Sequence, residues 1–282
     1  MKPPPFRYLR PGSVPEVLAA LGEFGDEAKV LAGGQSLVPL LNFRLARPSV
    51  LIDLQLVEEL RGIEAVDGDA VVGAMTIQAE AERSAALRGS CPLLGQALAL
   101  VGHLQIRNRG TIGGSAAHAD PAAELPAALL ALDAELVVRA AASGERVVPA
   151  AEFFRGPFTT AMGPQELLTH VRLPSVAGAR TEFLELARRS GDFAVAGVCG
   201  IDRGDRGSAD VALAAIGVGG SPVRLTEAEA VLRGRELTED LAREAGAAAA
   251  DAVDPPTDVH ADGAYRRELL GVLVRRLVLR LA

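Results

Sequence analysis

Apolar and polar positions in the first part of the chain alternate between helix-like and strand-like patterns. A capping box at Ser13–Glu16 precedes apolar residues at helical spacing, which predicts a short helix. Residues 28–32 and 49–53 are short apolar runs typical of buried strands, and the first of them leads directly into the pair Gly33-Gly34. The pattern therefore predicts a strand, a glycine loop, a helix and a second strand, in that order.

The middle of the chain carries the turn signals of two β-hairpins. Asp67-Gly68 and Ser143-Gly144 each lie between short strand-like runs. Asp120-Pro121 is typical of a helix start, with Asp120 as the N-cap and proline at the first helical position. The other elements predicted here are two helices, a closing strand and a linker, at residues 76–87, 92–101, 167–173 and Pro174–Gly178.

Beyond the linker, strand patterns come first and helix patterns follow, which indicates an α+β module. In the last predicted helix, Leu270, Val274 and Val278 belong to one apolar stripe, while Arg275 and Arg276 lie off it. A helix packed on its own sheet is therefore favoured over a partner-binding helix. The predicted strands are 181–187, 194–201 and 209–218, and the predicted helices are 226–232, 238–252 and 265–281.

The composition restricts the class of protein. The 282 residues are 49% hydrophobic and 23% charged, which suits a soluble protein of roughly two domains. A net charge of −7, with the arginines scattered among acids, argues against a nucleic-acid partner. The N-terminus has no apolar signal region, and no uninterrupted apolar run approaches the ~18 residues of a membrane span. We therefore expect a cytoplasmic protein without a membrane span.

The chain has two cysteines, which are too few thiolate ligands for a metal–thiolate centre. Cys91 and Cys199 are far apart in sequence and neither belongs to a C-x-x-C pair, so an iron–sulfur cluster or a cysteine-based zinc site is excluded. Cys199 lies in a strand-like apolar run, which favours an inert core thiol over a reactive one. Any metal redox chemistry must therefore come from a partner chain.

Two glycine pairs, Gly33-Gly34 and Gly113-Gly114, carry the candidate chemistry. A Gly-Gly pair beside hydroxyl residues lets successive backbone N–H groups converge on an anion, and two such loops would hold one diphosphate from both sides. Simple structural turns are the alternative interpretation. A Walker A loop is excluded because no Gly-Lys-Ser/Thr triplet occurs, and a Rossmann fingerprint fails because Pro222 replaces its last glycine.

The sequence around the two pairs is more specific than the pairs themselves. Residues 28–41 and 105–124, together with Arg188–Ala194, resemble the FAD-binding subunit of the molybdenum hydroxylases. The resemblance is strongest to the medium subunit of aerobic carbon monoxide dehydrogenases and extends over nearly the whole chain. It implies an α+β fold: a two-part FAD-binding domain of the vanillyl-alcohol-oxidase (PCMH) type, followed by a smaller α+β C-terminal domain with a sheet and helices. The implied bounds are 1–174, with parts at about 1–55 and 56–174, and 175–282.

The resemblance also implies FAD bound in an extended form, with its pyrophosphate between the glycine loops. Other flavoproteins of the wider superfamily attach FAD covalently through a histidine in the first loop, where this chain has Gln35 and no histidine, so noncovalent FAD is expected. No catalytic or metal-ligating residue is predicted. The expected cofactor-binding residues are Ala32, Gly33, Gly34, Gln35, Ser36, His103, Thr111, Ile112, Gly113, Gly114, Ser115, Asp120, Glu124 and Phe193.

Several of these residues have a second interpretation. Asp120 or Glu124 could accept a hydrogen bond from a ribose or ribityl hydroxyl. For Asp120 the other interpretation is the helix N-cap, and it could serve in both roles. Phe193 stacks on the isoalloxazine ring or fills the core. His103 touches the cofactor or is a structural histidine. His118 and Asp120 form an H-x-D pattern that invites a metal, but no third ligand lies near them in sequence.

By resemblance, the chain is the electron-transfer subunit of a three-subunit oxidoreductase. Substrate is hydroxylated at a molybdenum–pterin centre in a large subunit, and electrons pass through a small [2Fe-2S] subunit to this FAD and then to NAD, a quinone or oxygen. The substrate and the acceptor stay open. Two other hypotheses are a stand-alone FAD-dependent reductase or oxidase of the same fold and a non-catalytic anion-binding subunit.

Overall fold

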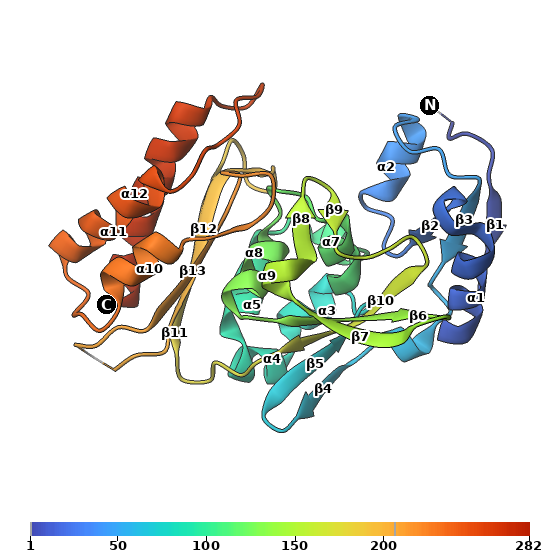
Figure 1. Ribbon diagram of the computed structural model, residues 1–282, viewed down its shortest axis with the longest axis horizontal. Helices are drawn as coiled ribbons and strands as arrows, with labels where there is room; N and C mark the ends of the chain where they lie inside the picture. The colour runs from blue at the N-terminus through green and yellow to red at the C-terminus, as the bar shows by residue number, and fades with distance from the viewer. Residues whose placement is uncertain (1, 206) are drawn as a thin grey trace.

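Three groups of elements follow one another along the long axis of the molecule (Figure 1). The computed structural model describes residues 2–205 and 207–282. The N-terminal group is drawn in blue, the middle group in cyan to yellow, and the C-terminal group in golden yellow to red. None of the described helices is both long and apolar enough to cross a membrane.

The N-terminal group is a small parallel sheet covered by one helix. Ser13 caps α1 (Val14–Phe24) by accepting a hydrogen bond from the Glu16 N–H, as the capping box predicts. The helix buries Val14, Val17 and Leu21 against the sheet, whose strands lie in the order β1-β3-β2. The strands and the remaining short helices are β1 (Arg7–Leu9), η1 (Gly25–Glu27), β2 (Ala28–Leu31), α2 (Leu37–Asn42), β3 (Val50–Asp53) and η2 (Glu58–Leu60).

The middle group is built on a five-stranded antiparallel sheet in the order β4-β5-β10-β6-β7. Both predicted hairpins are confirmed. Asp67 and Gly68 have φ values of 53° and 93°, the left-handed pair that a two-residue turn between twisted strands requires. The strands are β4 (Ile63–Val66), β5 (Asp69–Gly73), β6 (Glu135–Ala140), β7 (Gly144–Pro149) and β10 (Glu166–Leu173), with a separate short pair β8 (Phe154–Gly156) and β9 (Thr159–Thr160).

Two helix predictions in this group are wrong in detail. The helix expected at 76–87 is divided at Ser84, which ends one helix and caps the next through the Leu87 N–H. The helix expected to start at Asp120-Pro121 starts at Glu124, because Asp120 closes a turn onto Ala122 instead. The helices are α3 (Gln78–Arg83), α4 (Ala85–Ser90), α5 (Pro92–Leu100), α6 (Leu104–Arg107), α7 (Ile112–His118), α8 (Glu124–Ala131) and α9 (Ala150–Phe153).

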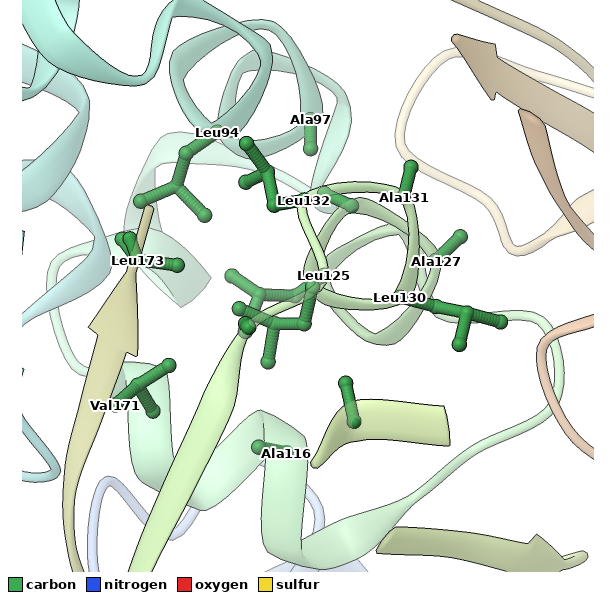
Figure 2. Packing of buried hydrophobic residues seen from close by; sticks show 14 of the residues in the cluster. Leu94, Ala97, Ala116, Leu125, Ala127, Leu130, Ala131, Leu132, Val171 and Leu173 are labelled. Carbon is green, nitrogen blue, oxygen red and sulfur yellow. The ribbon is translucent and has the colours of Figure 1, made fainter. Parts of the chain in front are cut away.

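Helix α8 is the centre of the core. All eight of its residues are buried, and apart from Glu124 all of them are apolar. Figure 2 shows Leu125 and Leu132 meeting Leu94 of α5 and Leu173 of β10, while Ala127 and Ala131 point the other way. That other side packs on the strands of the C-terminal group, so one hydrophobic core joins the two parts.

The C-terminal group is a four-stranded antiparallel sheet between two layers of helices. β11 (Arg180–Ala187), β12 (Ala194–Asp202), β13 (Val211–Ile216) and β14 (Val223–Arg224) lie in that order, with α5 and α8 on one face. Packed on the other face is α12 (Gly263–Leu281), which confirms its predicted apolar stripe; α10 (Thr226–Leu232) and α11 (Glu239–Asp251) complete this layer. Both faces of β12 are covered, and burial raises the pKa of its Cys199 thiol to about 12, which keeps that thiol inert.

Candidate functional site

The first glycine loop begins where β2 ends and is supported by the end of β3. Leu31 and Asp53 are paired in the parallel register of β2 and β3. The Asp53 carboxylate accepts a hydrogen bond from the Gln55 N–H at 2.9 Å, and the Gln55 side-chain amide donates to Ala32 O at 3.2 Å. This relay fixes the start of the loop relative to the sheet.

The second glycine loop is attached to the segment that follows β5. Ile112 N–H donates to Thr76 O at 3.0 Å, and Gly113 N–H donates to Ala74 O at 2.8 Å. The Thr111 hydroxyl accepts from Gly114 N–H at 3.0 Å, and Thr111 O accepts from Ser115 N–H at 3.1 Å. The expectation that residues 111–115 offer backbone N–H groups to a phosphate is therefore wrong for residues 112–115, because internal acceptors already occupy these four N–H groups.

The glycines have packing roles that the sequence did not reveal. A Cβ on Gly33 would lie 2.1 Å from Arg109 O, and a Cβ on Gly113 would lie 2.4 Å from the Ala74 Cβ. Both positions therefore permit close approach of two backbone segments. Gly34 has a φ of 74°, a left-handed conformation that strains other residues. Direct contact with a phosphate is not needed to explain these three glycines.

The two loops lie side by side, as the sequence predicted. Gly33 sits on the backbone of Arg109 and Gly110, and a Cβ on Gly114 would lie 3.4 Å from the Ala32 Cβ. These contacts join β2 of the N-terminal group to the α6–α7 connection of the middle group. The seam between the two parts of the predicted FAD-binding domain therefore passes through the paired glycine loops.

A cavity of about 370 Å³ opens beside the first loop. Among the described residues, no acceptor is bonded to the N–H groups of Gly33, Gly34 or Gln35, so these three amides are available to an anion. Arg109 and Asp53 are the charged residues of the lining. Asp53 is only 5% exposed, accepts from the Tyr8 hydroxyl and is paired with Arg10 at 3.8 Å, so in the part of the chain that the structure describes Arg109 carries the unpaired charge of the lining.

The cavity gathers four of the predicted cofactor-binding residues: Ala32, Gly33, Gly34 and Gln35. Ser36 and the second loop lie outside its lining, although the second loop touches the first. Sequence reasoning missed Asp53, Gln55 and Arg109, which also line it. The only available signal was their position, since Asp53 and Gln55 follow a predicted strand and Arg109 directly precedes the second glycine motif.

Asp120 lies in the connection between α7 and α8, and Glu124 is the first residue of α8. The prediction that Asp120 is a helix N-cap is wrong, because its carboxylate accepts from the Ala122 N–H at 2.9 Å in a turn before the helix. Glu124 is 5% exposed, and burial, with a smaller contribution from Asp120, raises its pKa to about 7. Burial also raises the pKa of Glu185 on β11 to about 7, and the charge of Glu124 adds to that shift.

His103 lies against the loop after β11, which also carries Phe193. A Cβ on Gly191 would lie 2.2 Å from His103 Cε1, so the loop after β11 rests on this histidine. Phe193, in the same loop, is 66% exposed, which contradicts the interpretation of it as a core residue. Its ring is therefore free to stack on a ligand.

The comparison with known proteins decides the family. A family model for the FAD binding domain in molybdopterin dehydrogenase matches residues 4–176, and one for the CO dehydrogenase flavoprotein C-terminal domain matches residues 181–281. The chain belongs to the FAD-binding medium subunits of the molybdenum hydroxylases. The predicted family, the FAD cofactor and the fold of a two-part FAD-binding domain followed by a smaller α+β domain are confirmed.

Individual relatives of this medium subunit cover nearly its full length. The alpha subunit of the 6-hydroxypseudooxynicotine dehydrogenase complex of Paenarthrobacter nicotinovorans is 41% identical over 98% of this chain and 94% of its own. A carbon monoxide dehydrogenase structure from Hydrogenophaga pseudoflava superposes with a TM-score of 0.97 and 37% identity, covering 100% of this chain and 98% of that one. The structure of quinoline 2-oxidoreductase from Pseudomonas putida 86 superposes with a TM-score of 0.94 and 35% identity, covering 100% of this chain and 98% of that one.

The medium subunit offers no separate metal centre in the part that the structure describes. Among residues 2–205 and 207–282, no group of three His, Cys, Asp or Glu side chains is placed to hold a metal ion. His118 of the H-x-D pattern packs on Phe158, with ring centroids 5.1 Å apart, and burial lowers its pKa. These contacts account for His118 as a structural residue.

The raised pKa of Glu124 predicts a pH-dependent stability. A carboxyl whose pKa is near 7 when folded and near 4.5 when unfolded stabilises the fold fully below pH 4.5, and this contribution is lost as the pH rises to about 7. The loss is about 3 kcal/mol. In urea unfolding at pH 5 and pH 8, the Glu124→Gln variant should lack most of this fall in the free energy of unfolding. The exposed control Glu152→Gln should keep it, and equal declines in both variants would contradict the assignment.

Proposed function

We propose that this chain is the electron-transfer subunit of a molybdenum-containing hydroxylase or dehydrogenase. It receives electrons from a small [2Fe-2S] subunit, which takes them from a large molybdopterin subunit, and delivers them to NAD, a quinone or oxygen. FAD supplies the redox chemistry when bound, and the protein supplies its binding, orientation and electrostatic environment. The observation that carries the proposal is the cavity with three free amides and a positive charge at the seam of a FAD-binding domain.

We assign the residues of this chain as follows. The amides of Gly33, Gly34 and Gln35 bind the pyrophosphate, and the second loop, Thr111–Ser115, supports them from behind and offers the Ser115 hydroxyl. Asp120 and Glu124 accept from ribose or ribityl hydroxyls, and Phe193 and His103 contact the flavin end. FAD is held noncovalently, since Gln35 has no nucleophilic ring nitrogen. The two domains divide at residues 174 and 175.

The choice of substrate lies outside this chain in our proposal. Relatives of similar identity come from enzymes named for 6-hydroxypseudooxynicotine, carbon monoxide and quinoline, which have little chemistry in common. A subunit that keeps the same fold across such different substrates is better explained by a shared electron path than by substrate recognition. The partner subunits and the acceptor therefore define the reaction.

Electron flow through the assembled complex tests this proposal. In rapid mixing of the three-subunit enzyme with its substrate under anaerobic conditions, the iron–sulfur absorbance should bleach before the flavin absorbance. The same complex depleted of FAD should still reduce an artificial dye but should lose at least about tenfold of its activity with the natural acceptor. Unchanged activity with the natural acceptor after FAD removal would contradict the proposal.

One observation favours the stand-alone enzyme as a second candidate. Such an enzyme needs an acid or base near its flavin, and Glu124 and Glu185 both have a pKa of about 7, which suits proton transfer at neutral pH. Steady-state turnover of a small-molecule donor by the isolated flavin-loaded chain would support this candidate, since the electron-transfer subunit should show only a single flavin reduction.

A further inference from the structure

The phosphate cavity has an uneven distribution of donors. The first loop contributes the free N–H groups of Gly33, Gly34 and Gln35, whereas the N–H groups of the second loop are bonded to Ala74, Thr76 and Thr111. A diphosphate carries two negative charges, and three neutral amides on one side do not balance them. A cationic side chain in the lining would supply the missing charge.

Arg109 is a positively charged residue in the lining of this cavity. Its side chain is exposed, and no described residue forms an ion pair or a hydrogen bond with its guanidinium. The neighbouring Arg107, by contrast, forms an ion pair with Glu82 at 2.9 Å. The other charged residue of the lining, Asp53, is bonded by Tyr8 and Gln55.

The backbone of Arg109 is held rigidly against the first glycine loop. Its N–H donates to Ile106 O at 3.0 Å in the turn that ends α6, and its carbonyl lies against Gly33. Behind it, Gly110 packs on the buried side chain of Gln78. The base of the guanidinium arm is therefore fixed relative to the three free amides, which lowers the entropy lost on binding.

We propose that the Arg109 guanidinium binds the diphosphate of the cofactor together with the amides of Gly33, Gly34 and Gln35, which line the same cavity. This inference rests on the proposed pyrophosphate site and names the residue that supplies its charge. A guanidinium forms two parallel hydrogen bonds with phosphate oxygens, a geometry that the ammonium of lysine does not reproduce. The second glycine motif therefore acts through the side chain that precedes it and through its support of the first loop.

The test compares FAD binding by the wild type and three variants of the full-length chain in calorimetric titrations. Arg109→Gln should weaken FAD binding about tenfold, the effect of losing a charge-assisted hydrogen bond at a partly solvated site. Arg109→Lys should recover part of the loss. Arg88→Gln is the matched control, because Arg88 is exposed on α4 and lies outside the cavity. Raising the salt concentration should reduce the difference between the wild type and Arg109→Gln.

Competition with FAD by two probes locates the effect at the diphosphate. The dissociation constant of ADP obtained from the competition should rise in Arg109→Gln by about the same factor as that of FAD, while the dissociation constant of adenosine, which lacks phosphate, should be the same for the variant and the wild type. Wild-type affinity of Arg109→Gln for FAD and ADP would overturn the inference and leave the proposed FAD site intact. Failure of the unchanged chain to bind FAD would overturn the proposed site itself, so the two failures are distinguishable.

Discussion

Gly33→Ala is expected to weaken FAD binding by roughly 10- to 100-fold. The added methyl group would lie 2.1 Å from Arg109 O and 2.9 Å from the Gly110 Cα, and neither is a flexible side-chain atom that can move aside. The two glycine loops must then separate, at a cost of about 1–3 kcal/mol for overpacking a close contact. Since the proposed diphosphate site lies on this contact, the cost falls on the affinity for FAD.

Gly22→Ala provides the matched control for this change. Gly22 lies within α1, and a Cβ there would meet nothing within 4 Å. Alanine in a helix interior is more stable than glycine by about 0.5–1 kcal/mol, so this variant should bind FAD normally and unfold at slightly higher urea concentration. Normal FAD affinity in Gly33→Ala would show that the loop contact does not shape the cofactor site.

Arg266→Ala is expected to destabilise the chain by about 3–5 kcal/mol, the usual cost of removing one partner from a buried charge network. Arg266 is 4% exposed and donates to Val195 O, to Gly217 O at 3.0 Å and to both carboxylate oxygens of Asp258 at 2.8 Å. The Gly217 N–H in turn donates to Pro121 O at 3.0 Å. The network thus links the C-terminal helix to the loop that carries Asp120 and leads into α8.

Arg267→Ala separates this effect from the loss of any arginine on α12. Arg267 is half-exposed and pairs with Asp254, which is fully exposed, so its removal should cost at most about 1 kcal/mol. Urea unfolding of both variants, followed by far-ultraviolet circular dichroism, measures the difference. Equal midpoints for the two variants would show that the buried network contributes little to stability.

Local patterns in the sequence predicted the elements whose determinants are local. The two hairpins follow from turns in which Asp67, Gly68 and Gly144 adopt left-handed conformations, and the helix at Ser13 follows from its capping box. The start of α8 was predicted wrongly because Asp120 bonds to Ala122, two residues away, before the helix begins. Two local options competed, and the tertiary context selected the turn.

The candidate site was predicted only in outline, because its geometry depends on contacts between distant segments. The sequence indicated that the two glycine motifs meet. It could not show that Ala74 and Thr76 occupy the amides of the second loop, or that Gly33 packs on Arg109. The raised pKa of Glu185 likewise depends on burial between two domains. Such features arise from the assembled fold and leave no spacing pattern along the chain.

The most direct test of the account is the visible spectrum of the full-length chain, recorded as purified and again after incubation with FAD and gel filtration. The account predicts a flavin spectrum that stays with the protein through gel filtration and is released intact on denaturation, as noncovalent binding requires. It also predicts that added FAD raises the thermal midpoint in proportion to the logarithm of its concentration. A colourless protein after incubation, with an unchanged midpoint, would contradict the assignment of this cavity as a FAD site.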